Sequence, residues 1–172
     1  MKYYVRKVQS LAMWKEGMEY KGIPSHQHAM RYALDIKEGR GCPCFWLAEN
    51  QEDLEKIAFC MLLNKKPSRP EPIRLLAFEQ NCFASRDFKL INKIDVSFPI
   101  PSIQHLHYEL SPANHETIWT IVKNFLEGNG SFKEFGKSQS VEGLPSIIEV
   151  AKKYINEVVE GYKEIALTII NY

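Results

Sequence analysis

The sequence predicts an α+β fold: a mixed or mainly antiparallel sheet of about five or six strands, packed by helices on one side, with a long C-terminal helix. Helical and strand patterns interleave along the 172 residues without a regular β-α-β repeat. Apolar residues near the C-terminus recur with helical spacing over about 27 residues. Hydrophobic residues make up 45% and charged residues 25% of the chain, which is typical of a soluble globular protein.

We expect three regions. Residues 1–127 alternate strand and helix patterns and form an α+β core domain. Residues 128–144 are polar and rich in Gly and Ser, which predicts a flexible loop. Residues 145–172 form the long C-terminal helix, either packed on the core or used for association.

The first half of the core contains two strands and at least two helices. Tyr3–Gln9 alternates and reads as the first strand, whereas Leu11–Gly22 fits either a short helix or a loop. Ser25 is a good N-cap for a helix that continues to about Glu38. The apolar run Cys44–Ala48 predicts a buried strand, and Asn50 caps a helix that ends near Asn64.

The second half of the core begins with the clearest strand. Ile73–Gln80 is apolar on both faces and suits the centre of a sheet. Weaker patterns predict a short strand at Phe88–Ile91 and an edge strand at Ile94–Phe98. Ile103–Leu110 predicts a further strand, followed by a helix with Ser111 as N-cap and Pro112 at its first position.

The Ile103–Leu110 strand carries the main candidate site. Alternation places Ile103, His105, His107 and Glu109 on one face. Residues two apart on a strand are roughly 6.5–7 Å apart, so His105 and His107 can share one divalent transition metal, with His115 of the next helix nearby. In a metal-dependent hydrolase these histidines would hold the ion and Glu109 would take a proton.

The layout of about two thirds of the chain offers a second chemistry. An early strand carries an arginine in Tyr4-Val5-Arg6, the strand FWLAEN at 45–50 runs directly into a helix beginning QEDLEKIA, and a later strand ends in Glu109. This order is similar to that of ADP-ribosyltransferase-type domains. The resemblance implies that Arg6 and Glu109 hold NAD and the attacking group. The Ser-Thr-Ser strand common in that family is absent from this chain.

The C-terminal stretch has an apolar stripe with alternating spacings of three and four residues, which is typical of a coiled-coil seam. Two interpretations remain open: a helix lying across the sheet, or a seam that pairs with a protein partner or a second copy through residues 145–171. The stripe consists of Ile148, Ala151, Ile155, Val158, Tyr162, Ile165 and Ile169.

Composition narrows the function classes. The formal net charge of +1 gives no bulk reason to expect a nucleic-acid partner, although local basic patches are compatible with it, and no apolar run is long enough to span a membrane. Four cysteines without a paired signature indicate free thiols and a cytoplasmic location. The leading hypothesis is a small binding or interaction protein. The alternative is an enzyme built on His105, His107 and Glu109, either metal-dependent or NAD-using.

Overall fold

A single antiparallel sheet organises the chain in the computed structural model, which describes residues 2–8, 11–19, 26–36, 43–94 and 97–172. Within these ranges the sheet has six strands in the order β4-β5-β2-β1-β3-β6, and each strand runs antiparallel to its neighbours. The strands are β1 (Tyr3–Lys7), β2 (Cys44–Ala48), β3 (Ile73–Glu79), β4 (Lys89–Asn92), β5 (His107–Ser111) and β6 (Gly130–Phe135). The predicted α+β class is confirmed.

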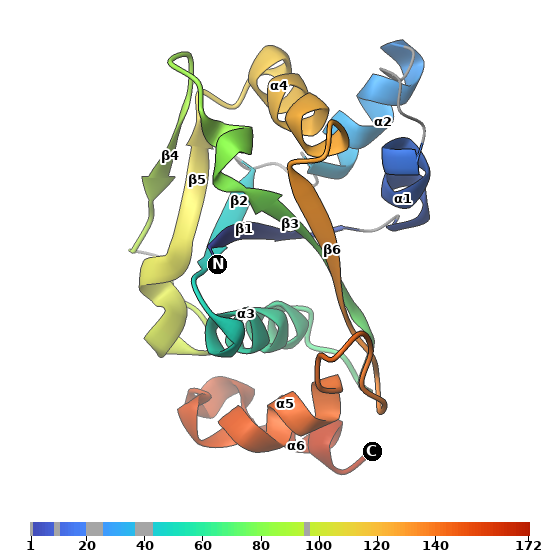
Figure 1. The fold of residues 1–172 in the computed structure, drawn as a ribbon. Coiled ribbons are helices and arrows are strands. Elements are labelled where there is room, and N and C mark those ends of the chain that lie inside the picture. Colours follow the sequence, from blue (N-terminus) through green and yellow to red (C-terminus); the bar gives the residue numbers. More distant parts are fainter. Residues whose placement is uncertain (1, 9–10, 20–25, 37–42, 95–96) are drawn as a thin grey trace.

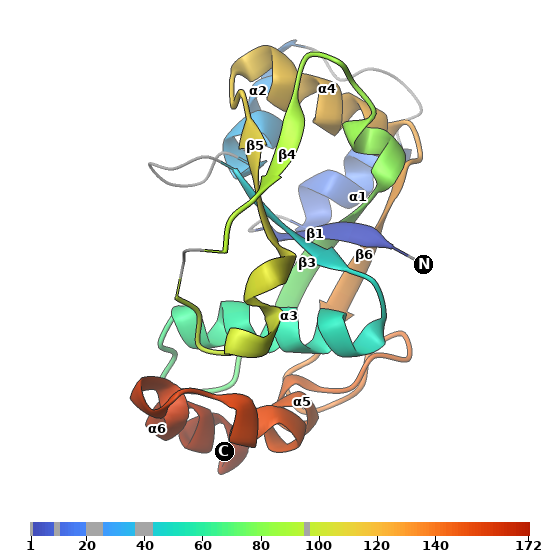
Figure 2. The same ribbon diagram turned by 90° about the vertical axis from the view of Figure 1, so that its left-hand side faces the viewer.

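Helices cover both faces of this sheet (Figures 1 and 2). They are α1 (Leu11–Glu19), α2 (His26–Ile36), α3 (Gln51–Asn64), α4 (His115–Leu126), α5 (Ile147–Tyr154) and α6 (Glu160–Ile170). One face carries α1, α2 and α4; the other carries α3, and α5 and α6 lie beyond α3. The expectation that helices pack on one side is therefore wrong.

The side chains of β3 explain why both faces need cover. Ile73, Leu75 and Ala77 are buried in the cluster shared with α3, α5 and α6. Leu76 and Phe78, on the opposite face, are buried with residues of α1, α2 and α4. A strand that is apolar on both sides is stable only when both sides are removed from water.

The segment from 145 onward is two helices instead of the one predicted. A 3₁₀ turn (Ile155–Glu157) follows α5, and Val158 and Val159 are extended before α6 begins. The amide of Val159 donates to the carbonyl of Pro99 at 3.0 Å, outside any helical ladder. Val158 is buried at 3% exposure, so tertiary packing and this hydrogen bond override the continuous helical pattern.

Two further predictions need correction. Residues 130–135 of the expected loop 128–144 form β6, which pairs with β3 along its whole length and buries Phe135. The predicted edge strand Ile94–Phe98 is not a strand at residues 94, 97 and 98, and its other two residues lie outside the described ranges. Cys42 also lies outside them, while Cys60 and Cys82 are buried free thiols.

Candidate functional site

The predicted histidine-bearing strand face does not form, because residues Pro101–Leu106 are a 3₁₀ helix and β5 begins only at His107. Ile103 and Leu106 turn into the core while His105 is exposed. The side-chain amide of Asn92 donates to the carbonyls of His105 (2.6 Å) and His107 (3.2 Å) and holds this turn at the end of β4. His105 and His107 are therefore not neighbours on one strand face.

His107 is a core residue. The residue is 4% exposed, and its imidazole packs against the rings of Trp46 and Phe98, at centroid distances of 5.0 and 4.9 Å. These two rings also contact each other, with centroids 4.5 Å apart. Its Nδ1 is 3.4 Å from the carbonyl oxygen of Lys93. Aromatic packing in the core therefore accounts for a histidine at this position.

The other predicted residues of the histidine site are Glu109 of β5 and His115 of α4. Glu109 forms an ion pair with Lys93 at 3.7 Å, and both side chains are partly exposed. His115 is exposed at the first position of α4, which begins beyond the far end of β5; Asn114 is the N-cap there, in place of the predicted Ser111. Among the residues that the structure describes, no group of three or more His, Cys, Asp or Glu side chains is arranged to hold a metal ion.

Arg6 and Glu109 lie on opposite faces of the sheet. Val5 is paired with Trp46, and Trp46 with His107, so these three side chains share one face. Glu109, two residues after His107, shares that face, whereas Arg6 follows Val5 and points the other way. The fold does not bring together the pair that the ADP-ribosyltransferase resemblance implies.

Arg6 has a local structural role on its own face. Its Nη1 donates to the carbonyl of Cys44 at 2.6 Å, which ties β1 to the start of β2. Its guanidinium lies 5.8 Å from the centroid of the Phe45 ring.

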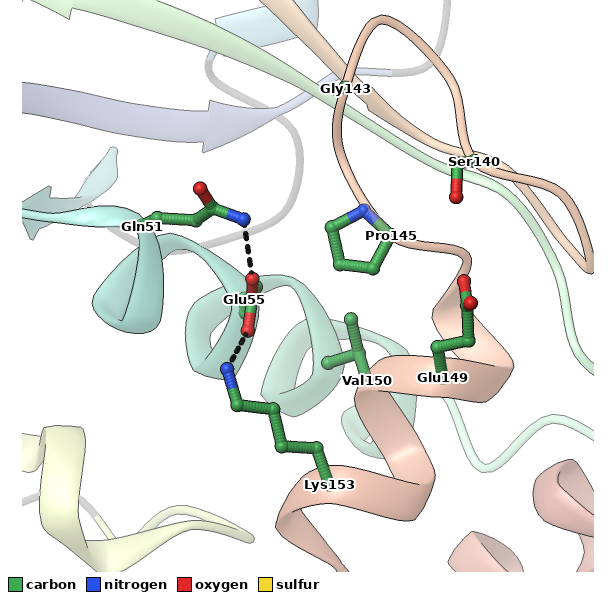
Figure 3. Close-up of a pocket in the computed structure, with 8 residues that line it drawn as sticks. All are labelled: Gln51, Glu55, Ser140, Gly143, Pro145, Glu149, Val150 and Lys153. Carbon is green, nitrogen blue, oxygen red and sulfur yellow. Dashed lines mark hydrogen bonds and ion pairs between the residues drawn. The ribbon is translucent and has the colours of Figure 1, made fainter.

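A different group of polar residues lines a pocket of about 310 Å³ between α3 and α5 (Figure 3). The side chains that line this α3–α5 pocket include Gln51 and Glu55 of α3, and Glu149 and Lys153 of α5. The hairpin before α5 contributes Ser140 and Gly143 to the wall. The apolar side chains of Pro145 and Val150 lie between the two carboxylates, Glu55 on one side and Glu149 on the other (Figure 3).

Glu55 is the buried centre of the pocket wall, with 3% of the residue exposed. Its Oε1 accepts a hydrogen bond from Gln51 Nε2 at 2.8 Å. Its Oε2 accepts from Lys153 Nζ and from Tyr154 Oη, each at 2.8 Å. A buried carboxylate requires such partners, because desolvation of an unpaired charge is costly.

Glu149 is held by the start of α5. Ser146 is the N-cap, and its side-chain oxygen accepts from the Glu149 amide at 3.3 Å. Glu149 Oε2 accepts in return from the Ser146 amide and hydroxyl, both at 2.7 Å. This reciprocal capping box fixes the carboxylate at the pocket wall.

The environments of both carboxyls keep them ionised. Burial acts to raise the pKa of Glu55, but the hydrogen bonds from Lys153, Tyr154 and Gln51 outweigh it, and the pKa lies below its ordinary value. Hydrogen bonds from the Ser146 side chain and backbone lower the pKa of Glu149. The hydrogen bond to Glu55 raises the pKa of Lys153. Two negative charges therefore face one positive charge at neutral pH.

A second group of polar residues, centred on Lys56, connects α3 to the segment that follows α5. Lys56 contacts Glu52 at 2.8 Å and Glu157, beyond α5, at 2.9 Å. Ser102 donates to the other oxygen of Glu157 at 2.6 Å. α3 and the segment that follows α5 are thus joined by charge as well as by apolar contact.

Sequence reasoning missed this pocket because its two principal partners, Glu55 and Lys153, are 98 residues apart. One signal was available: Ser146-x-x-Glu149 has the spacing of a capping box at the start of a helix. Gln51 and Glu55 also have the i, i+4 spacing of a helical side-chain pair. Neither pattern indicates which residues face them from the other helix.

Comparison with known proteins gave no match: no protein-family model fits the chain, and no significant similarity to a curated protein or a solved structure was found. None of the helices among the described residues combines the length and apolar character needed to cross a membrane.

Proposed function

We propose that this protein is a binding protein whose ligand site is the α3–α5 pocket, and that it takes a small polar molecule there. The observation that carries the proposal is the buried, ionised Glu55 at the wall of a cavity of about 310 Å³. Ligand pockets begin at roughly this size and typically combine apolar walls with a few placed polar groups. Pro145 and Val150 supply the apolar part (Figure 3).

The electrostatics favour binding over acid–base catalysis. A general acid at neutral pH needs a carboxyl whose pKa is raised, and a general base works best with a pKa near the working pH. The pKa values of Glu55 and Glu149 are both shifted downward, away from that range. Fixed carboxylates of this kind are suited to holding a ligand in a defined orientation.

The proposal also gives the C-terminal segment a role within the chain. α5 supplies one wall of the pocket, and the stripe residues Ala151, Val158 and Ile169 are buried in the same cluster as α3. The 145–171 segment then completes the ligand site, in place of the seam for a second chain that its spacing suggests.

A thermal-shift screen with amino acids, amines, sugars, nucleotides and organic acids tests the proposal. Ser140 is exposed and lies at the pocket, so Ser140→Trp should obstruct it. Ser138→Trp, two residues earlier, is exposed and does not line the pocket, which makes it the matched control. We expect at least one compound class to raise the melting temperature of the parent and of Ser138→Trp but not of Ser140→Trp. If no class does so, or if Ser140→Trp responds equally, the proposed function is wrong.

A further inference from the structure

The α3–α5 pocket contains a positively charged group of its own that a ligand can replace. Lys153 Nζ donates to Glu55 Oε2 at 2.8 Å, yet 58% of the Lys153 side chain is exposed. An exposed ammonium on a flexible four-carbon arm can return to water at little free-energy cost. Glu55 cannot, because it is buried.

The pocket has a net charge that favours a cation. Glu55 and Glu149 are both negative, and Lys153 is the one positive side chain among the residues that line it. When a ligand ammonium takes the place of Nζ on Glu55, the released Lys153 leaves two carboxylates facing the cavity. Gln51 and Tyr154 still donate to Glu55, so the carboxylate stays oriented.

The space between the two carboxylates is apolar. Pro145 and Val150 lie there (Figure 3), and methylene groups are the ligand parts that such a surface accommodates. A positive group at each end and a short hydrocarbon chain between them match this order of charges and apolar surface.

We propose that the α3–α5 pocket binds a small linear alkyl diammonium ion, with one ammonium replacing that of Lys153 on Glu55 and the other at Glu149. This inference rests on the proposed function, of which it names the ligand class. It makes Lys153 an internal competitor for the ligand, so removal of its charge should strengthen binding. A lysine with a purely structural role would not give that effect.

Titration calorimetry with 1,4-diaminobutane tests the inference, with n-butylamine and 1,4-butanediol as ligands that lack one or both charges. We expect the diamine to bind the parent more tightly than either. Glu149→Gln should weaken diamine binding about tenfold, as expected for loss of one charged hydrogen bond. Gln also serves at the third position of a capping box, so α5 should keep its start in this variant.

Lys153→Met is the decisive variant. We expect it to bind 1,4-diaminobutane at least about threefold more tightly than the parent, and by more than Lys152→Met, a neighbour that does not line the pocket. If Lys153→Met does not fold, Lys153→Gln removes the same charge. No heat of binding to the parent or to the Lys153 variant, up to about 10 mM diamine, would overturn the inference. So would unchanged affinity in Glu149→Gln or in the folded Lys153 variant.

The two proposals fail in different ways. If the compound screen finds a sugar or an anion that Ser140→Trp no longer binds, the pocket is a ligand site but the diammonium assignment is wrong. If the screen finds nothing and the diamine gives no heat, both are wrong.

Discussion

Replacing Glu55 by Gln tests the electrostatic centre of the pocket most directly. The side chain keeps its size, so no cavity forms. Its amide oxygen can still accept from Tyr154 Oη, but this oxygen carries no charge. Its amide nitrogen faces the donor Gln51 Nε2, so the hydrogen bond from Gln51 is lost. Lys153 is 58% exposed and regains water, so its contribution to the loss is small.

The expected loss of unfolding free energy is about 2–4 kcal/mol at pH 7. A hydrogen bond to a charged group contributes about 1.5–3 kcal/mol, and a neutral one about half of that. One hydrogen bond of Glu55 is lost in the variant and another loses its charge. The matched control is Glu164→Gln on α6, where the side chain is exposed and a change within about 0.5 kcal/mol is expected.

The dependence on pH gives a second, independent check. The folded pKa of Glu55 lies below the ordinary value of 4.5, so the unfolded chain binds a proton first as the pH falls. The stabilisation by ionised Glu55 is therefore complete well above pH 4.5 and is lost as the pH falls through the folded pKa. The difference between parent and Glu55→Gln should be constant near neutral pH and should shrink in acid.

Urea denaturation followed by tryptophan fluorescence, repeated across this pH range, measures both quantities. A Glu55→Gln variant as stable as the parent at pH 7 would refute the assignment of Glu55 as a charged, hydrogen-bonded centre. A difference that grows as the pH falls would refute the direction of its pKa shift.

Three further substitutions test the packing described above. His107→Ala should lower the unfolding free energy by about 2–4 kcal/mol because the buried imidazole packs against two aromatic rings, whereas His105→Ala, at an exposed position, should change it by less than about 0.5 kcal/mol. Equal effects in denaturant titrations would contradict this. Gly130→Ala should lower the unfolding free energy by about 1–3 kcal/mol, since a Cβ there would lie 2.2 Å from the buried ring of Phe125. Gly161→Ala has open space around it and should raise the unfolding free energy by about 0.5 kcal/mol, so the two melting temperatures in calorimetry should move in opposite directions. Val158→Asp should cost more than about 3 kcal/mol by burying an unpaired charge, and a folded variant with parental circular dichroism and melting temperature would show that this residue is not core.

Local pattern predicted most of the elements correctly. Cys44–Ala48 and Ile73–Glu79 are strands, and Asn50 caps α3 through a hydrogen bond from the Asp53 amide, as expected from propensity and capping rules. The predictions failed where a long-range contact overrides the local pattern. Residues 130–135 begin with glycine and lie in a segment rich in Gly and Ser, yet they form a strand because the edge of β3 is available to pair with them.

The candidate site also depends on contacts that local pattern does not indicate. The sequence identified His107 as a distinctive residue, but only the fold shows that it packs against Trp46 and Phe98. His105 was assigned to the same strand face, and the turn held by Asn92 removes it from that face.

By itself the sequence determined the α+β class, the apolar character of the central strand and the helical nature of the C-terminal segment, since these follow from residue spacing within short windows. Only the tertiary structure decided where that segment breaks, because the amide of Val159 donates to the carbonyl of Pro99, which is 60 residues earlier in the chain. It alone also decided that Glu55 meets Lys153 and Tyr154 at a pocket wall. Side-chain identity fixes what a residue can bond, but the partner of a buried charge depends on which surfaces the packed helices bring together.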